Sequence, residues 1–510
     1  MTPVSAAPLI QALLTCPDCY DHPVTRIELI ETHISWVLLT GEYAYKIKKP
    51  VNLGFLNFST VALRRQDCED EVRLNRRLAP ACYLGVIPIS GSPDMPRLNG
   101  PGEPIEYAVK MRQFPPEATL DQLAERGELG IEQIDRLAAR LAHFHLSECE
   151  PAPAGSPWGE PDTIAGPVEE NFKLLMEKPG SAQQLQRIQD WSITEHRRLE
   201  PLMRERKRSG RVRECHGDLH LGNLAWIDGE LLIFDCLEFN AALRWIDIIS
   251  EVAFCYMDLL HRQQPELAAR FLNAWLEITG DYDGVALLRY YAVYRAMVRA
   301  KVAALRGVQI VEESETTANR AELDSCLQLA ERLSQCEPPQ LWITHGLSGS
   351  GKTTLTQSLL QSRSMIRLRS DVERKRLAGL DALARSGEDI GAGLYSQSAS
   401  RNTYLQLASL AAHLLKAGWP VVVDAACLER WQRDLFHDLA HRLGATFRIL
   451  DIQADPATLR ERIAKRTEQG RDASDASMNV LQHQIETREP LAPSELANVT
   501  VIAQGELPKL

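Results

Sequence analysis

The pattern of hydrophobic and polar positions changes character near residue 337. Downstream of this point, short apolar runs alternate with longer helical patterns, which is typical of a parallel sheet with flanking helices. The runs that we predict to be strands are Leu341–Thr344, Met365–Leu368, Pro420–Val423 and Thr446–Ile452. The pattern therefore predicts an α/β domain over residues 337–510.

The upstream part has a different pattern, which predicts an α+β domain over residues 1–336. Residues 25–115 contain short strand-like runs and one helical stretch near 61–79, whereas residues 120–335 are mostly helical. We therefore expect a small β-rich lobe followed by a helical lobe. Two prolines separate the last helical stretch, Asn319–Leu333, from the next strand-like run, and they predict a linker between the domains.

Composition and charge exclude several classes of protein. The 510 residues are 45% hydrophobic and 25% charged, which is ordinary for globular domains. The net charge of −11 provides no overall basic field for nucleic acid. No apolar run reaches the roughly 18 residues that a membrane span needs, and the N-terminus lacks the basic start of a secretory signal. We therefore expect no membrane association and a cytoplasmic location.

The eleven cysteines are scattered along the chain, which favours reduced thiols over a disulfide framework. Cys16 and Cys19 have C-x-x-C spacing, for which a redox pair or half of a zinc site is the alternative interpretation. Because no second C-x-x-C follows, we interpret them as two incidental thiols.

The segment from Gly346 to Thr353 matches the phosphate-binding pattern G-x-x-x-x-G-K-[ST] in full. It follows a predicted strand and opens a helical pattern, which is the context that this motif needs. Its glycines allow backbone N–H groups to surround a phosphate at a helix N-terminus. We expect Lys352 to reach the β- and γ-phosphates of ATP and the Thr353 hydroxyl to bind Mg²⁺. The predicted nucleotide-binding residues are Gly346, Ser348, Gly349, Ser350, Gly351, Lys352, Thr353 and Thr354.

Charged residues after the next strands predict the rest of this site. Asp371 would face the substrate crevice and accept the proton of an attacking hydroxyl, with Arg374 binding the substrate or pairing with Asp371. Asp424 ends another strand, as the Mg²⁺-binding Asp of a Walker B element does. Arg462 and Arg466 lie four residues apart and are candidates for a lid over the transferring phosphate. The alternatives are a helix-capping Asp371, a turn-capping Asp424 and a solvated basic face.

A second set of catalytic residues lies in the upstream domain. Asp218 follows His216 and Gly217, and Asp218 and Asn223 keep the spacing of the protein-kinase catalytic loop H-R-D-L-x-x-x-N, with Gly in place of Arg. A later strand-like run ends in Asp235, where the Mg²⁺-binding Asp of kinases would lie. We predict Asp218 as the catalytic base and Asn223 and Asp235 as Mg²⁺ ligands.

The lysine that anchors ATP should lie on a strand of the small lobe and pair with a helical glutamate. Lys46 and Lys48 point to the same face of one predicted strand. We prefer Lys46, because it follows Ala-Tyr as the kinase lysine follows Ala-Ile. Glu71 is the preferred partner and Glu69 the alternative. The Gly-rich loop of protein kinases is absent, and a basic edge strand beside a solvated helix is the structural alternative.

These strings resemble two groups of kinases. The segment from His216 to Asn223, followed by the strand that ends at Asp235, is similar to the aminoglycoside phosphotransferase and choline kinase families, which have a protein-kinase-like fold. Residues 341–500 resemble the P-loop small-molecule kinases, such as gluconate kinase, chloramphenicol phosphotransferase, zeta toxin and polynucleotide 5′-kinase. The whole chain resembles a bacterial family that fuses the two domains, on the strings Thr32–Trp36, Tyr45–Pro50 and Phe234–Asn240.

The residues and the resemblances together predict an enzyme with two ATP sites that uses ATP and Mg²⁺. Each site would phosphorylate a hydroxyl group of a small molecule, such as a sugar, an aminoglycoside or a nucleotide-like acceptor. One alternative is a nucleotide-sensing regulatory ATPase in which one domain controls the other. Another is that the downstream domain phosphorylates the 5′-hydroxyl ends of nucleic acids, which its Asp371-x-x-Arg374 pair would permit. The sequence predicts neither the acceptor nor the oligomeric state.

Overall fold

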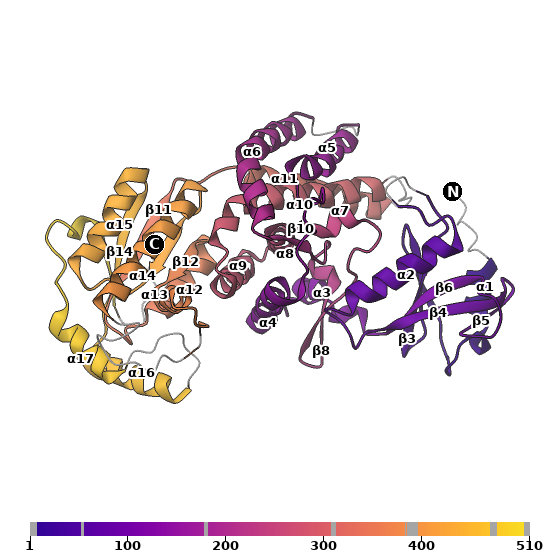
Figure 1. Cartoon of the computed structure of the whole chain (residues 1–510), viewed down its shortest axis with the longest axis horizontal. Helices are drawn as coiled ribbons and strands as arrows, with labels where there is room; N and C mark the ends of the chain where they lie inside the picture. Colours follow the sequence, from indigo (N-terminus) through magenta and orange to yellow (C-terminus); the bar gives the residue numbers. More distant parts are fainter. Residues whose placement is uncertain are drawn as a thin grey trace. The chain divides into compact units, whose positions relative to one another are not determined.

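The first strands of the chain form one antiparallel sheet in the computed structural model, which describes residues 8–52, 56–177, 182–307, 313–382, 384, 396–469 and 477–503 (Figure 1). The strand order is β1-β2-β3-β6-β4-β5. Helix α2 (Val61–Asn75) packs against β4 and β6, and the Thr60 side chain caps its first turn. The strands are β1 Glu28–Glu31, β2 Ser35–Leu39, β3 Tyr43–Lys48, β4 Tyr83–Ser92, β5 Met95–Leu98 and β6 Glu106–Arg112. This confirms the predicted β-rich lobe.

The residues after this sheet are mostly helical, as predicted, with two short strand pairs among them. β7 (Val212–Glu214) pairs with β10 (Trp245–Asp247), and β8 (Leu224–Ile227) pairs with β9 (Glu230–Ile233), both antiparallel. A short N-terminal helix, α1 (Pro8–Thr15), precedes the first sheet. The later helices are α3 Leu120–Glu125, α4 Ile131–His143, α5 Pro161–Met176, α6 Ala182–Arg208, α7 Ala241–Arg244, α8 Ile248–His261, α9 Pro265–Thr279, α10 Val285–Arg306 and α11 Glu313–Leu333.

The downstream part forms a five-stranded sheet of order β12-β13-β11-β14-β15, in which every pairing is parallel. All four residues of β13 are buried, as expected where helices cover both faces of a parallel sheet. The strands are β11 Gln340–His345, β12 Ile366–Arg369, β13 Val421–Asp424, β14 Thr446–Ile452 and β15 Val499–Ile502. The helices are α12 Lys352–Arg363, α13 Ser370–Leu377, α14 Gln397–Lys416, α15 Arg430–Leu443, α16 Pro456–Gln469 and α17 Met478–Thr487.

Four of these five strands were predicted, with bounds that agree to within one residue. The strand β15 was not predicted, because it is short, lies at the sheet edge and buries only Ile502. Its alternation of valine and threonine is therefore not the continuous apolar run that marks an interior strand. The α/β architecture of residues 337–510 is nonetheless the one that the pattern predicts.

Tertiary contacts divide the chain into two units whose limits run through the helical residues. The first comprises Met1–Gln133, His143–Pro167 and Glu200–Asp258. The second comprises Ile134–Ala142, Val168–Leu199 and Leu259–Leu510. The second unit therefore contains α9, α10 and α11 as well as the parallel sheet, and the domain boundary near residue 337 stays a prediction.

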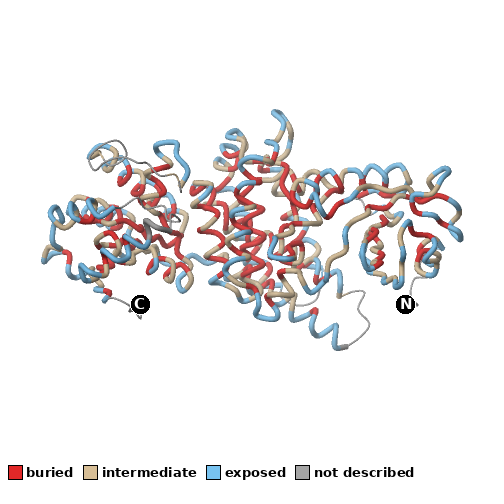
Figure 2. The backbone as a smooth tube through the Cα atoms, turned by 90° about the horizontal axis from the view of Figure 1, so that it is seen from below, coloured by how far each residue is buried: buried red, intermediate tan, exposed pale blue. Residues whose placement is uncertain are grey.

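The core follows the amphipathic pattern of the helices. Buried and exposed residues alternate along most helices in Figure 2, so that each helix turns one face inward. Helix α8 differs most, because twelve of its 14 residues are buried, which marks it as an interior helix. Among the described residues, no helix has the length and apolar character to cross a membrane. Cys16 and Cys19 are both free thiols.

Candidate active sites

Lys46 of β3 lies between two carboxylates of the first unit. Its Nζ is 2.9 Å from Oε1 of Glu71 on α2 and 2.7 Å from Oδ1 of Asp235. Glu71 is fully buried, whereas 45% of the Asp235 side chain is exposed. Burial alone would lower the pKa of Lys46, but Asp235 and Glu71 outweigh it and raise this pKa, so the lysine stays charged. Glu69, the alternative partner, instead pairs with Arg65 at the surface.

Asn223 and Asp235 come together because the β8–β9 hairpin joins them. The hairpin turns at Asp228 and Gly229, whose φ angles of 51° and 82° suit a two-residue turn. At the open end of the hairpin, the N–H of Phe234, the residue before Asp235, donates to the Asn223 carbonyl at 3.0 Å. The Asn223 amide in turn donates to Oδ2 of Asp218 at 3.2 Å. The structure thus brings the three predicted residues to one end of a small hairpin.

The backbone of the catalytic loop, residues 216–221, is held by two buried carboxylates of α8. Oε1 of Glu251 accepts the N–H groups of His216 at 2.6 Å and Gly217 at 2.9 Å. Two helical turns later, Asp258 accepts the N–H of Leu221 at 2.8 Å. Any displacement of this loop would remove hydrogen bonds from these buried carboxylates, which is costly. Neither carboxylate was predicted, because no local pattern connects α8 with the loop.

Gly217 stands where protein kinases have Arg, and its geometry explains the exchange. Its φ angle is 90°, a left-handed conformation that favours glycine. A Cβ at this position would lie 2.9 Å from the carbonyl oxygen of Leu243. A side chain here would therefore displace the backbone beside Asp218.

Lys48, the alternative anchor, is fully buried among three carboxylates. Its Nζ is 2.9 Å from Oδ2 of Asp67 and 2.5 Å from Oε2 of Glu71, and it also pairs with Glu238. Burial opposes its charge, but Glu238 and Glu71 outweigh burial and raise the pKa of Lys48. The side chain has no exposed surface, so its surroundings are those of a structural ion cluster.

The phosphate-binding loop joins β11 to α12 with the backbone conformations that its glycines permit. Gly349 and Gly351 have φ angles of 83° and 99°. A Cβ at Gly349 would lie 2.9 Å from a backbone oxygen of α16. The Nζ of Lys352 donates to the carbonyl oxygens of Gly346 at 3.0 Å and Leu347 at 2.9 Å. The backbone of the loop therefore has positive φ angles at two of the glycines of the motif.

The oxygen atoms at both sites suit Mg²⁺, a hard cation that takes hydroxyl, amide and carboxylate ligands. In the second unit, Oγ1 of Thr353 donates to Oδ2 of Asp424 at 2.9 Å. The buried Oγ of Ser350, also in the loop, has no hydrogen-bond partner among the described residues. In the first unit, Asn223 and Asp235 offer an amide and a carboxylate oxygen. Thr353 with Asp424, and Asn223 with Asp235, are thus the residues that would hold the ion.

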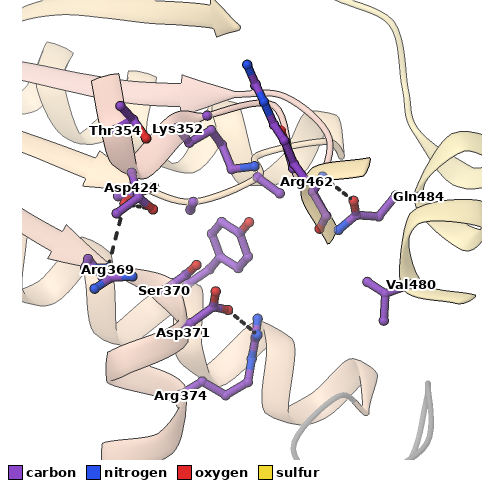
Figure 3. A pocket seen from close by; sticks show the side chains of 17 residues that line it. Lys352, Thr354, Arg369, Ser370, Asp371, Arg374, Asp424, Arg462, Val480 and Gln484 are labelled. Atoms are coloured by element: carbon purple, nitrogen blue, oxygen red, sulfur yellow. Dashed lines mark hydrogen bonds and ion pairs between the residues drawn. The ribbon is translucent and has the colours of Figure 1, made fainter. Parts of the chain in front are cut away.

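Asp371 and Arg374 line the same cleft as the phosphate-binding loop, a cavity of about 260 Å³ (Figure 3). Asp371 lies in the first turn of α13, directly after β12, but the N-cap is Arg369 and no side chain caps the helix. Nη1 of Arg374 is 3.2 Å from Oδ1 of Asp371. Figure 3 shows the Asp371 carboxylate pointing into the cleft. The helix-capping alternative for Asp371 therefore has no hydrogen bond to support it.

Arg462 of α16 contacts the phosphate-binding loop from the opposite side. Its Nη1 donates to the carbonyl oxygens of Gly349 and Ser350, each at 3.2 Å. The side chain of Arg466 lies outside the described residues. The predicted lid role of the two arginines stays a prediction.

The residues that line this cleft include Arg369, Tyr404 and Gln484, which were not predicted. Arg369 ends β12, so the rule that ligands bind at the carboxyl ends of parallel strands would have found it. Tyr404 on α14 and Gln484 on α17 carry no comparable signal. Gln484 is far from the loop in the sequence, and the fold brings its Oε1 to the Ser348 N–H, which donates to it at 2.9 Å.

Sequence comparison connects these two sites with known families. Residues 64–288 match the family described as the phosphotransferase enzyme family, and residues 341–491 match a family described as an AAA domain. The chain is also 30% identical over 453 residues to uncharacterized protein Rv2004c of Mycobacterium tuberculosis, across 86% of this chain and 87% of that protein. The chain belongs to the family of this mycobacterial protein. The predicted two-domain organisation, a phosphotransferase domain followed by a P-loop kinase domain, is confirmed.

Solved structures resemble each part of this two-domain family member. A choline/ethanolamine kinase family protein from Mesorhizobium loti is 10% identical, with a TM-score of 0.35, over 61% of this chain and 94% of that chain. A gluconokinase from Sinorhizobium meliloti 1021 is 19% identical, with a TM-score of 0.24, over 34% of this chain and 86% of that chain. Because both matched domain families are kinase families, the chain is an ATP-dependent phosphotransferase.

Proposed function

We propose that this enzyme has two ATP·Mg²⁺ sites and that each transfers the γ-phosphoryl group to a hydroxyl group of a small molecule. One observation carries the proposal: in each unit a lysine, a set of oxygen donors suited to Mg²⁺ and a further carboxylate belong to one site. In the first unit these are Lys46, Asn223, Asp235 and Asp218. In the second unit they are Lys352, Thr353, Asp424 and Asp371.

In the first site, Asp218 accepts the proton of the acceptor hydroxyl as the phosphoryl group is transferred. Its carboxylate is oriented by the Asn223 amide, and its backbone is fixed by the bonds of the loop to α8. Lys46 holds the ATP phosphates. We prefer it to Lys48 because Lys46 contacts Asp235, a proposed Mg²⁺ ligand, whereas Lys48 is enclosed by carboxylates.

In the second site, backbone N–H groups of the loop and Lys352 bind the phosphates. A bound phosphate offers Lys352 stronger, charged acceptors than the two loop carbonyls it now contacts. Asp371 takes the acceptor proton, and Arg374 orients its carboxylate. Arg462, already in contact with the loop, adds positive charge near the transferring group.

The test measures phosphorylated products from the full-length enzyme with a panel of acceptors. The panel contains sugars, aminoglycosides, nucleosides and 5′-hydroxyl oligonucleotides, each with ATP and Mg²⁺. A general base contributes about 10²- to 10⁴-fold to the rate. Asp218→Asn should therefore slow formation of the first-site products by about this factor, and Asp371→Asn should do the same for the second-site products. The double variant should remove both sets.

Asp434→Asn is the matched control, because this exposed carboxylate on α15 pairs only with the neighbouring helical Arg430 among the contacts seen. It should leave both activities unchanged. A wild-type enzyme that yields no phosphorylated product with any acceptor would overturn the proposal. ATP binding at one site without product would instead support the regulatory alternative, and transfer only to 5′-hydroxyl oligonucleotides would support the nucleic-acid kinase.

A further inference from the structure

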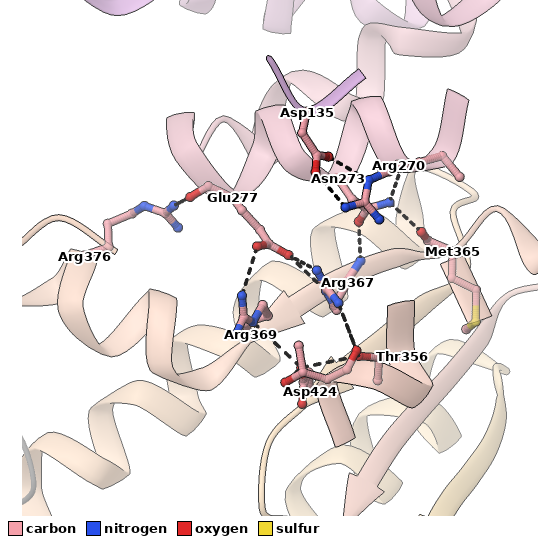
Figure 4. A network of polar contacts seen from close by, with 12 residues as sticks. Asp135, Arg270, Asn273, Glu277, Thr356, Met365, Arg367, Arg369, Arg376 and Asp424 are labelled. Atoms are coloured by element: carbon pink, nitrogen blue, oxygen red, sulfur yellow. Dashed lines mark hydrogen bonds and ion pairs between the residues drawn. The ribbon is translucent and has the colours of Figure 1, made fainter. Parts of the chain in front are cut away.

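Helix α9, which precedes the P-loop sequence by some seventy residues, supplies hydrogen bonds to an edge of the parallel sheet (Figure 4). The edge strand is β12, and an edge strand leaves backbone groups without sheet partners. The buried Asn273 of α9 donates to the Met365 carbonyl at 3.0 Å and accepts the Arg367 N–H at 2.8 Å. One side chain of α9 therefore satisfies two backbone groups at this edge.

One helical turn later, Glu277 of α9 meets two arginines of β12. Arg367 donates twice to Oε1 of Glu277, at 2.9 and 2.6 Å, and Arg369 donates to Oε2 at 3.3 Å. The Glu277 side chain is only 15% exposed. Burial alone would raise the pKa of Glu277, but the charges of Arg367 and Arg369 outweigh it and lower this pKa, so the carboxylate is ionised.

The same two arginines reach the proposed Mg²⁺ ligands. Nη1 of Arg367 is 3.4 Å from the carbonyl oxygen of Thr353. Nε of Arg369 is 3.8 Å from Oδ2 of Asp424, the atom that also accepts the Thr353 hydroxyl. Figure 4 shows the resulting chain of contacts from Glu277 through the arginines to Asp424. Glu277 thus balances positive charge beside a site for a divalent cation.

We propose that Glu277 is a positioning residue of the P-loop site, which keeps the Asp424 carboxylate available to Mg²⁺ by holding Arg367 and Arg369. This inference rests on the proposed function of the P-loop site. Without the Glu277 carboxylate, Arg369 pairs more closely with Asp424 and competes with the cation for it. The P-loop site therefore depends on a helix that lies outside the P-loop sequence.

The test measures the Mg²⁺ concentration that gives half-maximal ATP binding, by calorimetry on the full chain. Lys46→Met is present in every sample to silence the first site. Loss of a residue that supports a metal ligand weakens metal binding by about 10- to 100-fold, so Glu277→Gln should raise the half-saturating Mg²⁺ concentration by at least about tenfold. Glu277→Asp should restore part of this loss, and adding Arg369→Gln to Glu277→Gln should restore it by removing the competing cation.

Asn273→Ala is the matched control on the same helix, because it breaks bonds to β12 without changing the charge near Asp424. It should lower the melting temperature and leave the Mg²⁺ dependence unchanged.

If the Lys46→Met protein binds no ATP with Mg²⁺, the proposed function of this site fails. If it binds ATP and a folded Glu277→Gln protein keeps the same Mg²⁺ dependence, the inference fails and the function stands. If Glu277→Gln does not fold, the single variant Arg369→Gln tests the inference instead. It should lower the half-saturating Mg²⁺ concentration, and an unchanged concentration would refute the positioning role of Glu277.

Discussion

Two lysines on one strand, Lys46 and Lys48, should give opposite phenotypes when each is replaced by methionine. Lys48→Met leaves Asp67, Glu71 and Glu238 buried without the cation that they share. Removing one partner of a buried ion pair costs about 3–5 kcal/mol. Domains are stable by only about 5–15 kcal/mol, so this variant should lose a large part of the stability of the β-rich lobe.

Lys46→Met should be milder for stability and more severe for catalysis. Glu71 keeps Lys48 as a partner, and Asp235 is 45% exposed and can be solvated. Loss of a charge that stabilises the transition state typically lowers the rate by about 10²- to 10³-fold. Lys46→Met should therefore nearly abolish transfer at the first site and shift the unfolding midpoint much less than Lys48→Met does.

The assay pairs urea unfolding with product formation at the first site. Asp371→Asn is introduced into both variants, so that the second site does not contribute product. The reasoning is refuted if Lys48→Met unfolds at the wild-type urea concentration, or if Lys46→Met retains wild-type transfer.

Three further predictions follow from the same contacts. Gly217→Ala should lower first-site activity and destabilise the fold by about 1–3 kcal/mol, because the residue must keep a positive φ beside a carbonyl; an unchanged urea midpoint would contradict this. Burial alone would raise the pKa of Glu214, but its hydrogen bond from Arg73 and its other arginine partners outweigh burial and lower it. A lowered pKa in the folded state adds stability above the unfolded value of about 4.3, and this stability is lost as pH falls through the folded pKa. The gap in melting temperature between wild type and Glu214→Gln should thus be widest above about pH 4.3 and narrow in acid; a pH-independent gap would count against it. Thr353→Ala should weaken ATP binding in the presence of Mg²⁺ and change it little in EDTA, as calorimetry can measure.

Many residues of the two candidate sites were predicted from local sequence. The spacing of Asp218 and Asn223, and the order of glycines before Lys352, are set by backbone turns that a few consecutive residues form. Such turns bring the same side chains together wherever they occur, so the structure places these residues as expected. The domain order was predictable for a similar reason, because strand and helix patterns depend on neighbours in sequence.

The sequence favours Lys46 over Lys48 only through the preceding Ala-Tyr pair, and the tertiary structure adds the charges that surround each lysine. The two residues share a strand face, and alternation cannot separate them. What distinguishes them is the carboxylates from α2 and from the residues after β9 that surround each one. The residues that hold the catalytic loop, Glu251 and Asp258, were unpredictable for the same reason.

The sequence on its own therefore determined the two motifs, their order and the class of reaction, because each depends on residues close together in the chain. Only the tertiary structure decided which charges surround those motifs. Glu277 shows why: its contacts with Arg367 and Arg369 join residues about ninety positions apart. No periodicity or spacing encodes such a contact, since it arises when a helix of one region packs on the sheet edge of another.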